Sequence, residues 1–210
     1  MDFKIYSGEF KMINSWIRKL GYCFIKLEVG KTRASTSFAK DYFKDKRIDV
    51  VEIGVYEGTN ANNIIEELNI NKIYLIDPYI SGAYKEKEIV RAEKKAHKLL
   101  DKDERVIWIK DFSKNVFNKV GEPDFIYIDG DHNYNYFKDD IEDYYEVLKE
   151  GGILAGDDLD TLDVSRAFWE FVIKNEIDMK NVYYSKYDWW IVKEIKGDDG
   201  DDRRIFVRGF

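Results

Sequence analysis

The sequence predicts an α/β protein with a three-layer α/β/α architecture. Its seven-stranded sheet is expected to be mostly parallel and to end in an antiparallel C-terminal hairpin. Three observations support this. Short apolar runs alternate with amphipathic segments between residues 48 and 175. These runs are continuously apolar, as in parallel strands covered by helices on both faces. After residue 180, strand-like runs follow one another with only turns between them, which indicates antiparallel pairing.

The first 46 residues are expected to form a helical cap region ahead of a main domain at 47–210, the two making one compact domain overall. Helices are predicted at about 8–20 and 34–45, joined by the segment EVGKTRAST (28–36). The chain contains no repeat and no long low-complexity linker. Its length is sufficient for a single domain with a full hydrophobic core.

The first two strand–helix units occupy residues 48–100. IDVVEI (48–53) is rich in β-branched residues and predicts a strand, while ANNIIEEL (61–68) has helical spacing. KIYLID (72–77) predicts the second strand, and residues 84–100 predict a long helix. The apolar stripe expected on this helix consists of Ile89, Ala92, Ala96 and Leu99.

The third and fourth strands are expected at RVIWIK (105–110) and DFIYID (124–129), with a short helix at 113–119 between them.

The next segment, 136–152, places its apolar residues on one helical face, and Gly151 is expected to cap the end of this helix. GILAG (152–156) predicts the fifth strand, and a helix is expected around 163–175.

The C-terminal segment predicts the antiparallel edge of the sheet. VYYSKY (182–187), DWWIVKEI (188–195) and RRIFVRG (203–209) are strand-like. KGDDGDD (196–202) is typical of a hairpin connection.

Composition limits the classes of partner and of compartment. The formal net charge is −7 and the chain has one cysteine, Cys23. An acidic chain is a poor match for nucleic-acid backbones and anionic membrane surfaces. A lone cysteine cannot form an internal disulfide, which favours a reducing cytosol. The first residues lack an apolar signal core, and no apolar run reaches transmembrane length. We therefore expect a cytoplasmic protein without a nucleic-acid or membrane partner.

Ligands of open α/β sheets bind beyond the carboxyl ends of the strands, so the residues at these ends are the candidates for a site. Gly54 and Gly58 follow the first strand in a tight turn that leads to a helix starting near Thr59. Such a turn lets backbone approach a ligand closely. Its G-x-x-x-G spacing is not the G-x-G-x-x-G of nicotinamide enzymes. Asp77 ends the second strand, where an acid can accept hydrogen bonds from two ribose hydroxyls.

Two further strand ends carry candidate residues. Asp111 and Ser113 follow the third strand and are placed to meet an adenine ring, although Ser113 is also suited to a helix N-cap. Asp129 ends the fourth strand, and Asp157 and Asp158 end the fifth. If these strands are neighbours, three carboxylates converge and need a positive partner. Oxygen ligands of this kind suit Mg²⁺.

The chain has two histidines, and they are given different roles. His132 lies three residues after Asp129, and His97 lies in a lysine-rich helix. Histidine is the side chain best matched to base chemistry near neutral pH. We expect His132 to act as a general base and His97 to be an ordinary surface residue.

The motifs, taken in order, resemble a known family. EIGVYEGTN (52–60) resembles the cofactor loop of class I S-adenosylmethionine-dependent methyltransferases, specifically of the caffeoyl-CoA and catechol O-methyltransferases. DFIYIDGDHNY (124–134) and EGGILAGDDL (150–159) resemble their metal-binding strands, and EVGKTRAS (28–35) resembles their cofactor-covering N-terminal region. The resemblance covers about residues 28–195. It implies a Rossmann-like methyltransferase fold with residues 47–210 as the catalytic domain.

The resemblance also implies roles for individual residues. S-adenosylmethionine would lie against Glu52, Gly54, Tyr56, Gly58, Thr59, Asp77, Asp111, Ser113 and Asp129. Mg²⁺ would be bound by Asp129, Asp157 and Asp158, and His132 and Asp129 would be catalytic. The caffeoyl-CoA and catechol enzymes carry Asn in place of Asp158 and Lys in place of His132. With those two residues the chain is more similar to macrolide-sugar O-methyltransferases, in which a histidine at this place is the base.

The expected activity is therefore Mg²⁺-dependent methylation of a hydroxyl on a small, sugar-like or phenolic molecule. Three alternatives remain at this point. Two are other enzymes of the same fold, an aminopropyl transferase and a nicotinamide enzyme. The third is a module that binds the cofactor without catalysis. The sequence identifies neither the acceptor nor the oligomeric state, and a homo-oligomer is left open.

Overall fold

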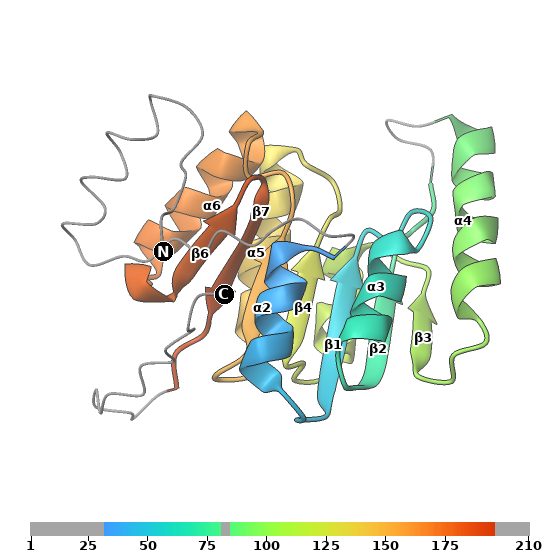
Figure 1. The fold of residues 1–210 in the computed structure, drawn as a ribbon. Coiled ribbons are helices and arrows are strands. Elements are labelled where there is room, and N and C mark those ends of the chain that lie inside the picture. The colour runs from blue at the N-terminus through green and yellow to red at the C-terminus, as the bar shows by residue number, and fades with distance from the viewer. Residues whose placement is uncertain (1–31, 81–84, 196–210) are drawn as a thin grey trace.

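A computed structural model of the chain describes residues 32–80 and 85–195. Its sheet has seven strands in the order β3-β2-β1-β4-β5-β7-β6. β1 to β5 are mutually parallel, and β7 runs antiparallel to both β5 and β6 (Figure 1). This confirms the expected fold class. The strands are β1 (Ile48–Ile53), β2 (Ile70–Ile76), β3 (Val106–Ile109), β4 (Phe125–Ile128), β5 (Ile153–Gly156), β6 (Val182–Ser185) and β7 (Asp188–Val192).

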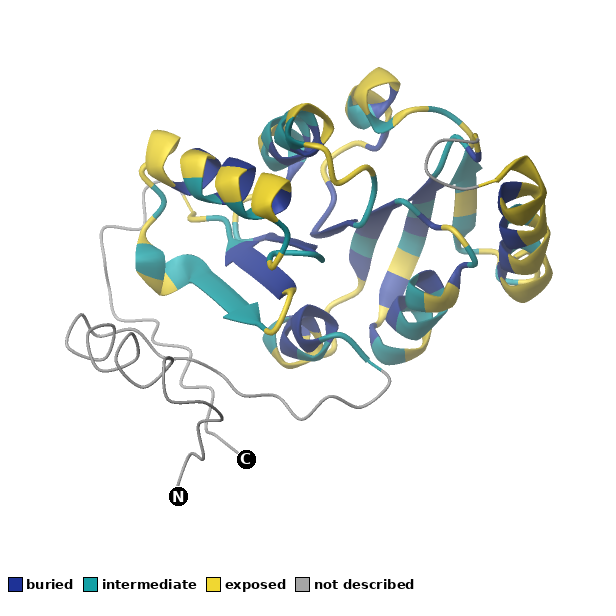
Figure 2. Cartoon of the chain, turned by 90° about the horizontal axis from the view of Figure 1, so that it is seen from above, coloured by how far each residue is buried: buried dark blue, intermediate teal, exposed yellow. Residues whose placement is uncertain are grey.

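Helices cover both faces of the sheet (Figures 1 and 2). One face packs against α2 (Ala34–Phe43), α3 (Thr59–Glu67) and α4 (Glu86–Leu100). The other packs against α5 (Tyr134–Val147) and α6 (Leu162–Lys174). In β1, Val50 contributes to the first core and Val51 to the second. Successive side chains of a strand point to opposite faces, so a strand buried on both sides needs the continuous apolar run that the sequence shows.

Several expected details differ in the structure. The helix expected at 113–119 is instead two 3₁₀ turns, η1 (Ser113–Asn115) and η2 (Phe117–Lys119). α5 ends at Val147 with Leu148 at its C-cap, so the prediction that Gly151 caps it is wrong. Gly151 has a φ of 70° and lies in the turn before β5. On α4, Leu100 is buried in place of Leu99, because it completes the stripe one residue later.

The antiparallel edge is confirmed, with β6 and β7 forming a hairpin. Lys186 and Tyr187 join β6 to β7, and Lys186 takes the left-handed conformation at φ 59°. The expected connection at 196–202, the strand at 203–209 and the helix at 8–20 lie outside the described residues. The boundary between a cap region and the main domain at residues 46 and 47 stays a prediction.

Candidate active site

The carboxyl ends of β1, β4 and β5 lie side by side at one end of the sheet. The last residues of these strands are in register with one another. The residues that follow, Gly54, Asp129 and Asp157, are therefore neighbours although they are far apart in the sequence. The strand order makes β1, β4 and β5 the three central strands of the sheet, so their carboxyl ends lie at its middle. Open α/β sheets bind their ligands beyond this end.

The loop between β1 and α3 runs directly against the loop that follows β4. Gly54 and Gly58 have φ angles of +81° and +77°. A Cβ atom on Gly54 would lie 1.9 Å from the carbonyl oxygen of Asp129, so only glycine fits there. Gly58 is the N-cap residue of α3, and Thr59 is its first residue. Free N–H groups at a helix N-terminus favour the negatively charged part of a ligand.

Asp77 fixes the shape of this loop from the end of β2. Its Oδ2 accepts hydrogen bonds from the backbone N–H groups of Val55 and Tyr56, each at 2.9 Å. Its Oδ1 accepts one from Tyr79 at 2.8 Å. Tyr56 itself has a positive φ of 48° and an exposed side chain. A carboxylate has about four acceptor positions, so Asp77 retains room for a ligand hydroxyl.

Glu52 is the acid most deeply buried at this end, with a relative exposure of 1%. Its Oε1 accepts a hydrogen bond from Asn60 Nδ2 at 2.8 Å, whereas its Oε2 has no partner among the described residues. Burial raises the pKa of Glu52 to about 8. An unpartnered buried carboxyl oxygen is costly, so this atom indicates a ligand that supplies a donor.

Asp111 and Ser113 lie beyond the carboxyl end of β3, the edge strand that pairs with β2. Asp111 Oδ1 accepts hydrogen bonds from Phe112 N and Asn115 Nδ2, both at 2.8 Å. Ser113 is the first residue of η1, and its Oγ donates to Asp140 of α5. The N-cap interpretation of Ser113 is therefore wrong, because Phe112 occupies that position.

Acidic groups from the ends of β4 and β5 surround His132. Its Nδ1 lies 3.0 Å from Asp158 Oδ2, and its Nε2 lies 3.6 Å from Asp129 Oδ1. Interaction with the Asp129 carboxylate is the main cause that raises the pKa of His132, and the charge of Asp158 adds to it. Asp158 has a φ of 59°, which turns the chain sharply after β5. A histidine held at one ring nitrogen by a carboxylate is the arrangement of an oriented base.

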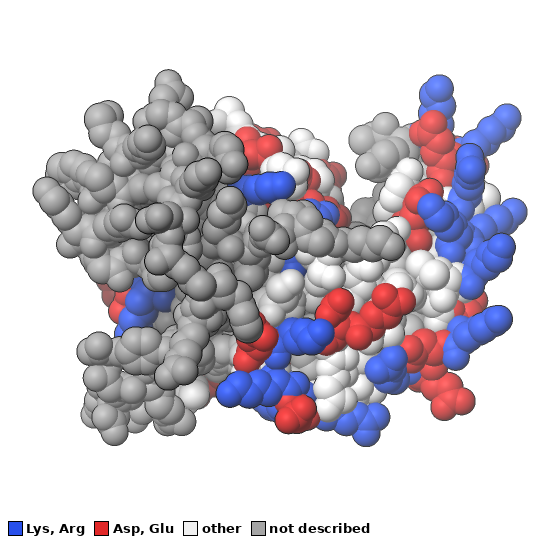
Figure 3. Space-filling model, viewed as in Figure 1, with Lys and Arg blue, Asp and Glu red and all other residues white. Residues whose placement is uncertain are grey.

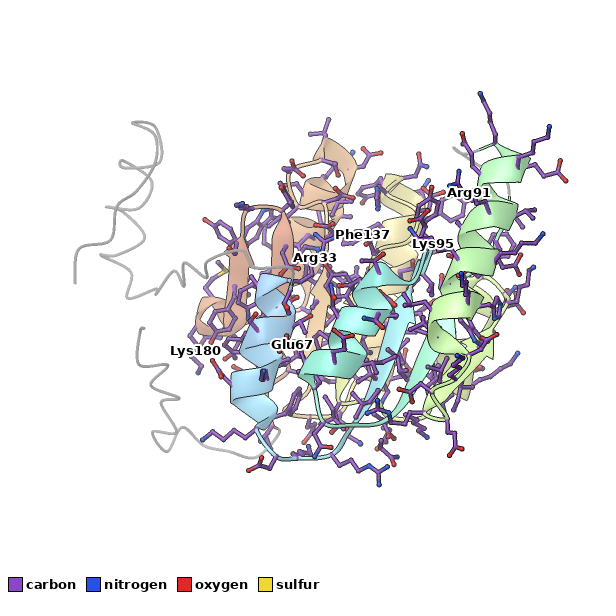
Figure 4. The ribbon with its side chains drawn as sticks, turned by 45° about the vertical axis from the view of Figure 1, so that its right-hand side comes forward. Arg33, Glu67, Arg91, Lys95, Phe137 and Lys180 are labelled. Atoms are coloured by element: carbon purple, nitrogen blue, oxygen red, sulfur yellow. The ribbon has the colours of Figure 1, made fainter. Side chains whose placement is uncertain are left out.

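The third carboxylate, Asp157, has a different partner that sequence reasoning missed. Arg33 Nη2 lies 2.5 Å from Asp157 Oδ2 and 3.8 Å from Asp129 Oδ2. Figure 4 shows Arg33 at the start of α2. The sequence resemblance to a cofactor-covering region spans residues 28–35, but no signal in this segment singles out Arg33. Its partners lie more than 90 residues away, so local spacing could not reveal the contact.

The donor atoms fit a divalent cation in part. Asp129, His132 and Asp158 each offer one ligand atom, and these three atoms lie within 4.8 Å of one another. Asp157 is not in this group, and its Oδ2 pairs with Arg33. Its Oδ1 is buried without a hydrogen-bond partner among the described residues. The two carboxylates suit Mg²⁺ or Mn²⁺, and a third carboxylate would complete a more typical oxygen set, whereas an imidazole is a ligand that Zn²⁺ and other transition metals prefer.

Comparison with known proteins shows the family of this chain. A model of the methyltransferase domain family matches residues 51–159, just over half of the chain. An uncharacterised protein of Acanthamoeba polyphaga mimivirus is 26% identical over 158 residues, which are 71% of this chain and 69% of the viral protein. The range matched by the family model includes the β1–α3 loop and the acidic ends of β4 and β5.

Solved structures share the fold at low identity. The calicheamicin methyltransferase CalS11 has a TM-score of 0.58 and 14% identity, covering 75% of this chain and 77% of its own. The O-methyltransferase NovP has a TM-score of 0.55 and 17% identity, covering 76% and 79%. MycE, solved with Mg, SAH and mycinamycin VI, has a TM-score of 0.54 and 14% identity, covering 80% and 51%. Among residues 32–80 and 85–195, no helix is long and apolar enough to span a membrane.

Proposed function

The chain belongs to the methyltransferase domain family, and from that premise we propose that it is an O-methyltransferase acting on a hydroxyl of a small molecule. S-adenosylmethionine is its methyl donor. The observation that carries the proposal is the pairing of His132 with Asp158, next to the glycine loop of β1. A base oriented by a carboxylate is what a hydroxyl acceptor requires, because a hydroxyl must lose its proton to become a good nucleophile.

The cofactor is proposed to lie across the ends of β2, β1 and β4. When bound, S-adenosylmethionine supplies a methyl group activated by a positively charged sulfur. Glu52 Oε2 would accept a hydrogen bond from the amino group of its methionine part, which would satisfy the unpartnered oxygen. The glycine loop and the start of α3 would border this part, with Gly54, Tyr56, Gly58 and Thr59. Asp77 would accept a hydrogen bond from a ribose hydroxyl at its remaining acceptor position, and Asp111 and Ser113 would border the adenine.

His132 is proposed to take the proton of the acceptor hydroxyl. Asp158 lies at Nδ1 and would hold the ring, and Nε2, which lies 3.6 Å from Asp129 Oδ1, would take the proton. The negative charges of Asp129 and Asp158 would also stabilise the imidazolium that forms when the proton arrives. General-base catalysis of this kind contributes roughly 10²–10⁴-fold in rate.

A divalent cation, Mg²⁺ in the cell, is proposed as the second catalytic component. Asp129 and Asp158 would bind it, and Asp157 would join them after leaving Arg33. The metal would supply a Lewis acid that stabilises negative charge on the acceptor oxygen. His132 lies close enough to serve as a ligand, but the proposal keeps it as the base. MycE was solved with Mg, which supports a metal in a protein of this fold.

The acceptor is proposed to be sugar-like or phenolic. Exposed apolar side chains lie at the starts of α5 and α6 and in the β6–β7 turn, namely Tyr136, Leu162 and Tyr187. The backbone of Tyr187 bonds to that of Leu159, which brings this turn to the end of β5. Aromatic and aliphatic surfaces around a polar centre are typical of small-molecule pockets. CalS11, which shares the fold, is a TDP-rhamnose 3'-O-methyltransferase, and this supports a sugar acceptor.

The test is a screen of hydroxylated acceptors, both sugars and phenols, with S-adenosylmethionine. The readout is release of S-adenosylhomocysteine, with Mg²⁺ and with EDTA. We expect turnover with at least one acceptor and its loss in EDTA. Calorimetry with S-adenosylmethionine and with NAD is the control for the cofactor. Methylation of an amine or thiol analogue in preference to every hydroxyl compound would refute the O-methyltransferase proposal.

A further inference from the structure

Arg33 is built into the site rather than lying over it by chance. It is the N-cap residue of α2, and its side chain is only partly exposed, at 29%. The guanidinium contacts carboxylates from two different strand ends and lies over the ring of Tyr127, 6.0 Å from the centroid. Within residues 32–80 and 85–195, it is the one Lys or Arg that pairs with Asp129 or Asp157.

The residues next to Arg33 are fixed by a buried hydrogen-bond network. Asp188 of β7 accepts from Ser35 N at 2.7 Å and from Ser35 Oγ at 3.1 Å. Tyr127 of β4 donates to the same carboxylate at 3.1 Å. All three residues are buried. The start of α2 is therefore tied to two strands, so the root of the Arg33 side chain has little freedom to move away from the carboxylates.

This placement has a consequence for a metal. A guanidinium and a divalent cation compete for the same carboxylate oxygen, and the two positive charges repel each other at close range. With Arg33 in place, the ligand atoms that lie together are those of Asp129, His132 and Asp158. Asp157, the remaining acid at these strand ends, is held by the guanidinium.

We propose that Arg33 is the resident cation of this site and sets its affinity for divalent metal. In the metal-free enzyme Arg33 neutralises Asp157, and a metal that recruits Asp157 must displace the guanidinium. The inference rests on the proposed function only in taking the same acids as metal ligands. Arg33 would be a positioning residue, since it acts through Asp157.

The experiment is calorimetric titration of the full-length protein with Mn²⁺ in the absence of cofactor and acceptor. Arg33→Met should bind Mn²⁺ at least about tenfold more tightly than wild type, because a competing charge is removed. Arg33→Lys keeps the charge and should show a smaller gain. The matched control is Arg105→Met. Arg105 pairs with Asp103 at 2.7 Å, next to the start of β3 and so at the other end of the strands. Its loss should leave Mn²⁺ affinity unchanged.

A double-mutant cycle assigns the gain to Asp157. In the wild-type background, Asp157→Asn should change Mn²⁺ affinity by less than about threefold, whereas in the Arg33→Met background it should remove most of the gain. The inference is overturned if Arg33→Met binds Mn²⁺ no better than wild type. It is also overturned if Asp157→Asn weakens binding in the wild type as strongly as Asp129→Asn does. That second comparison stands even if Arg33→Met does not fold.

The result separates the two proposals. Mn²⁺ affinity is measured without turnover, so the effect of Arg33 is seen whether or not an acceptor is found. Conversely, an acceptor that is methylated equally well in EDTA would remove the metal from the reaction. The tighter Mn²⁺ binding of Arg33→Met would still hold in that case.

Discussion

Two buried acids, one near each end of β1, differ in how many hydrogen-bond donors they have. Asp124 lies just before β4 and accepts hydrogen bonds from Lys46, Lys149 and the backbone of Asp49. Burial acts to raise the pKa of Asp124, but these donors bring it below its ordinary value. Glu52, near the other end of β1, has one donor and a pKa raised to about 8. The structural acid is fully partnered and the site acid is not, as expected where a ligand completes the partners.

The role of His132 predicts a specific kinetic change. His132→Ala should lower kcat by roughly 10²–10⁴-fold with little change in the acceptor KM, because proton transfer belongs to the transition state. Affinity for S-adenosylmethionine, measured by calorimetry, should be close to that of wild type. His97→Ala is the matched control, since His97 also pairs with a carboxylate, that of Asp101 at 2.8 Å, on the surface of α4. Equal loss in both variants would contradict the base assignment.

The same residue sets the direction of the pH dependence. The Asp129 carboxylate raises the pKa of His132 above its ordinary value of 6.5. A general base must be neutral to accept a proton, so kcat should fall as the pH drops through this raised pKa. An acid limb is therefore expected in the wild-type profile and should be absent from the residual activity of His132→Ala. The raised pKa is that of the metal-free protein, and a divalent cation on Asp129 and Asp158 would shift it in the opposite direction.

Gly54 predicts a second effect at the residue scale. Gly54→Ala and Gly121→Ala both place a side chain at positive φ, at +81° and +73°, which costs roughly 1–2 kcal/mol. Only Gly54 also meets backbone, with the Asp129 oxygen at 1.9 Å, whereas nothing lies within 4 Å of a Cβ on Gly121. Urea unfolding should show the larger loss of stability in Gly54→Ala. Calorimetry should show weaker S-adenosylmethionine binding in that variant alone, and equal affinities would mean that the loop contact does not shape the cofactor site.

At the scale of the elements, the sequence predicted the strands and loops that depend on the local pattern of residues. All five parallel strands follow from apolar runs, because burial on both faces demands them. The glycine loop and the acids at strand ends followed from the same reasoning. The ends of helices were less predictable. Gly151 was expected to cap α5, but it lies in the turn that follows. Arg33 was missed because its contact with Asp157 joins α2 to the end of β5, and only tertiary packing brings these together.

The contact between α5 and η1 predicts how stability depends on pH. Asp140 of α5 is buried and accepts a hydrogen bond from Ser113, and burial raises its pKa from 3.8 to about 7. The folded state therefore holds this proton more tightly than the unfolded state, so the stability contributed by Asp140 falls as the pH rises from 3.8 to about 7. Asp140→Asn removes this loss. Its free energy of unfolding should improve relative to wild type across that window, by roughly 4 kcal/mol at most.

Urea unfolding of both proteins at about pH 4.5 and about pH 8 measures the effect. Asp143→Asn, on the same helix, is the control, since Asp143 is less buried and its pKa is raised chiefly by that partial burial. It should show the same trend to a smaller extent. A difference between Asp140→Asn and wild type that stays constant with pH would mean that this carboxyl does not titrate as a buried group.

At the scale of the whole molecule, acidic charge is concentrated at the mouth of the site. The two segments that follow β4 and β5 carry the aspartates Asp129, Asp131, Asp157, Asp158, Asp160 and Asp163. Asp163 accepts a hydrogen bond from Tyr134 N, which brings the starts of α5 and α6 together. Arg33 neutralises part of this charge. Elsewhere the signs are mixed: over α4 and the lower front surface in Figure 3, basic and acidic side chains are interspersed.

This distribution predicts a preference in acceptor charge. With a net charge of −7 and acids around the entrance, the field should attract cationic acceptors and repel anionic ones. For an amino sugar and a uronic acid that present the same hydroxyl, kcat/KM should favour the amino sugar by about tenfold or more at low salt. Salt screens charges beyond a Debye length of roughly 10 Å at 0.1 M, so this ratio should shrink as NaCl is added. A neutral sugar should be nearly insensitive to salt and is the control. An anionic acceptor that is preferred at low salt would show that a local cation, with Arg33 the first candidate, outweighs the acidic field of the molecule.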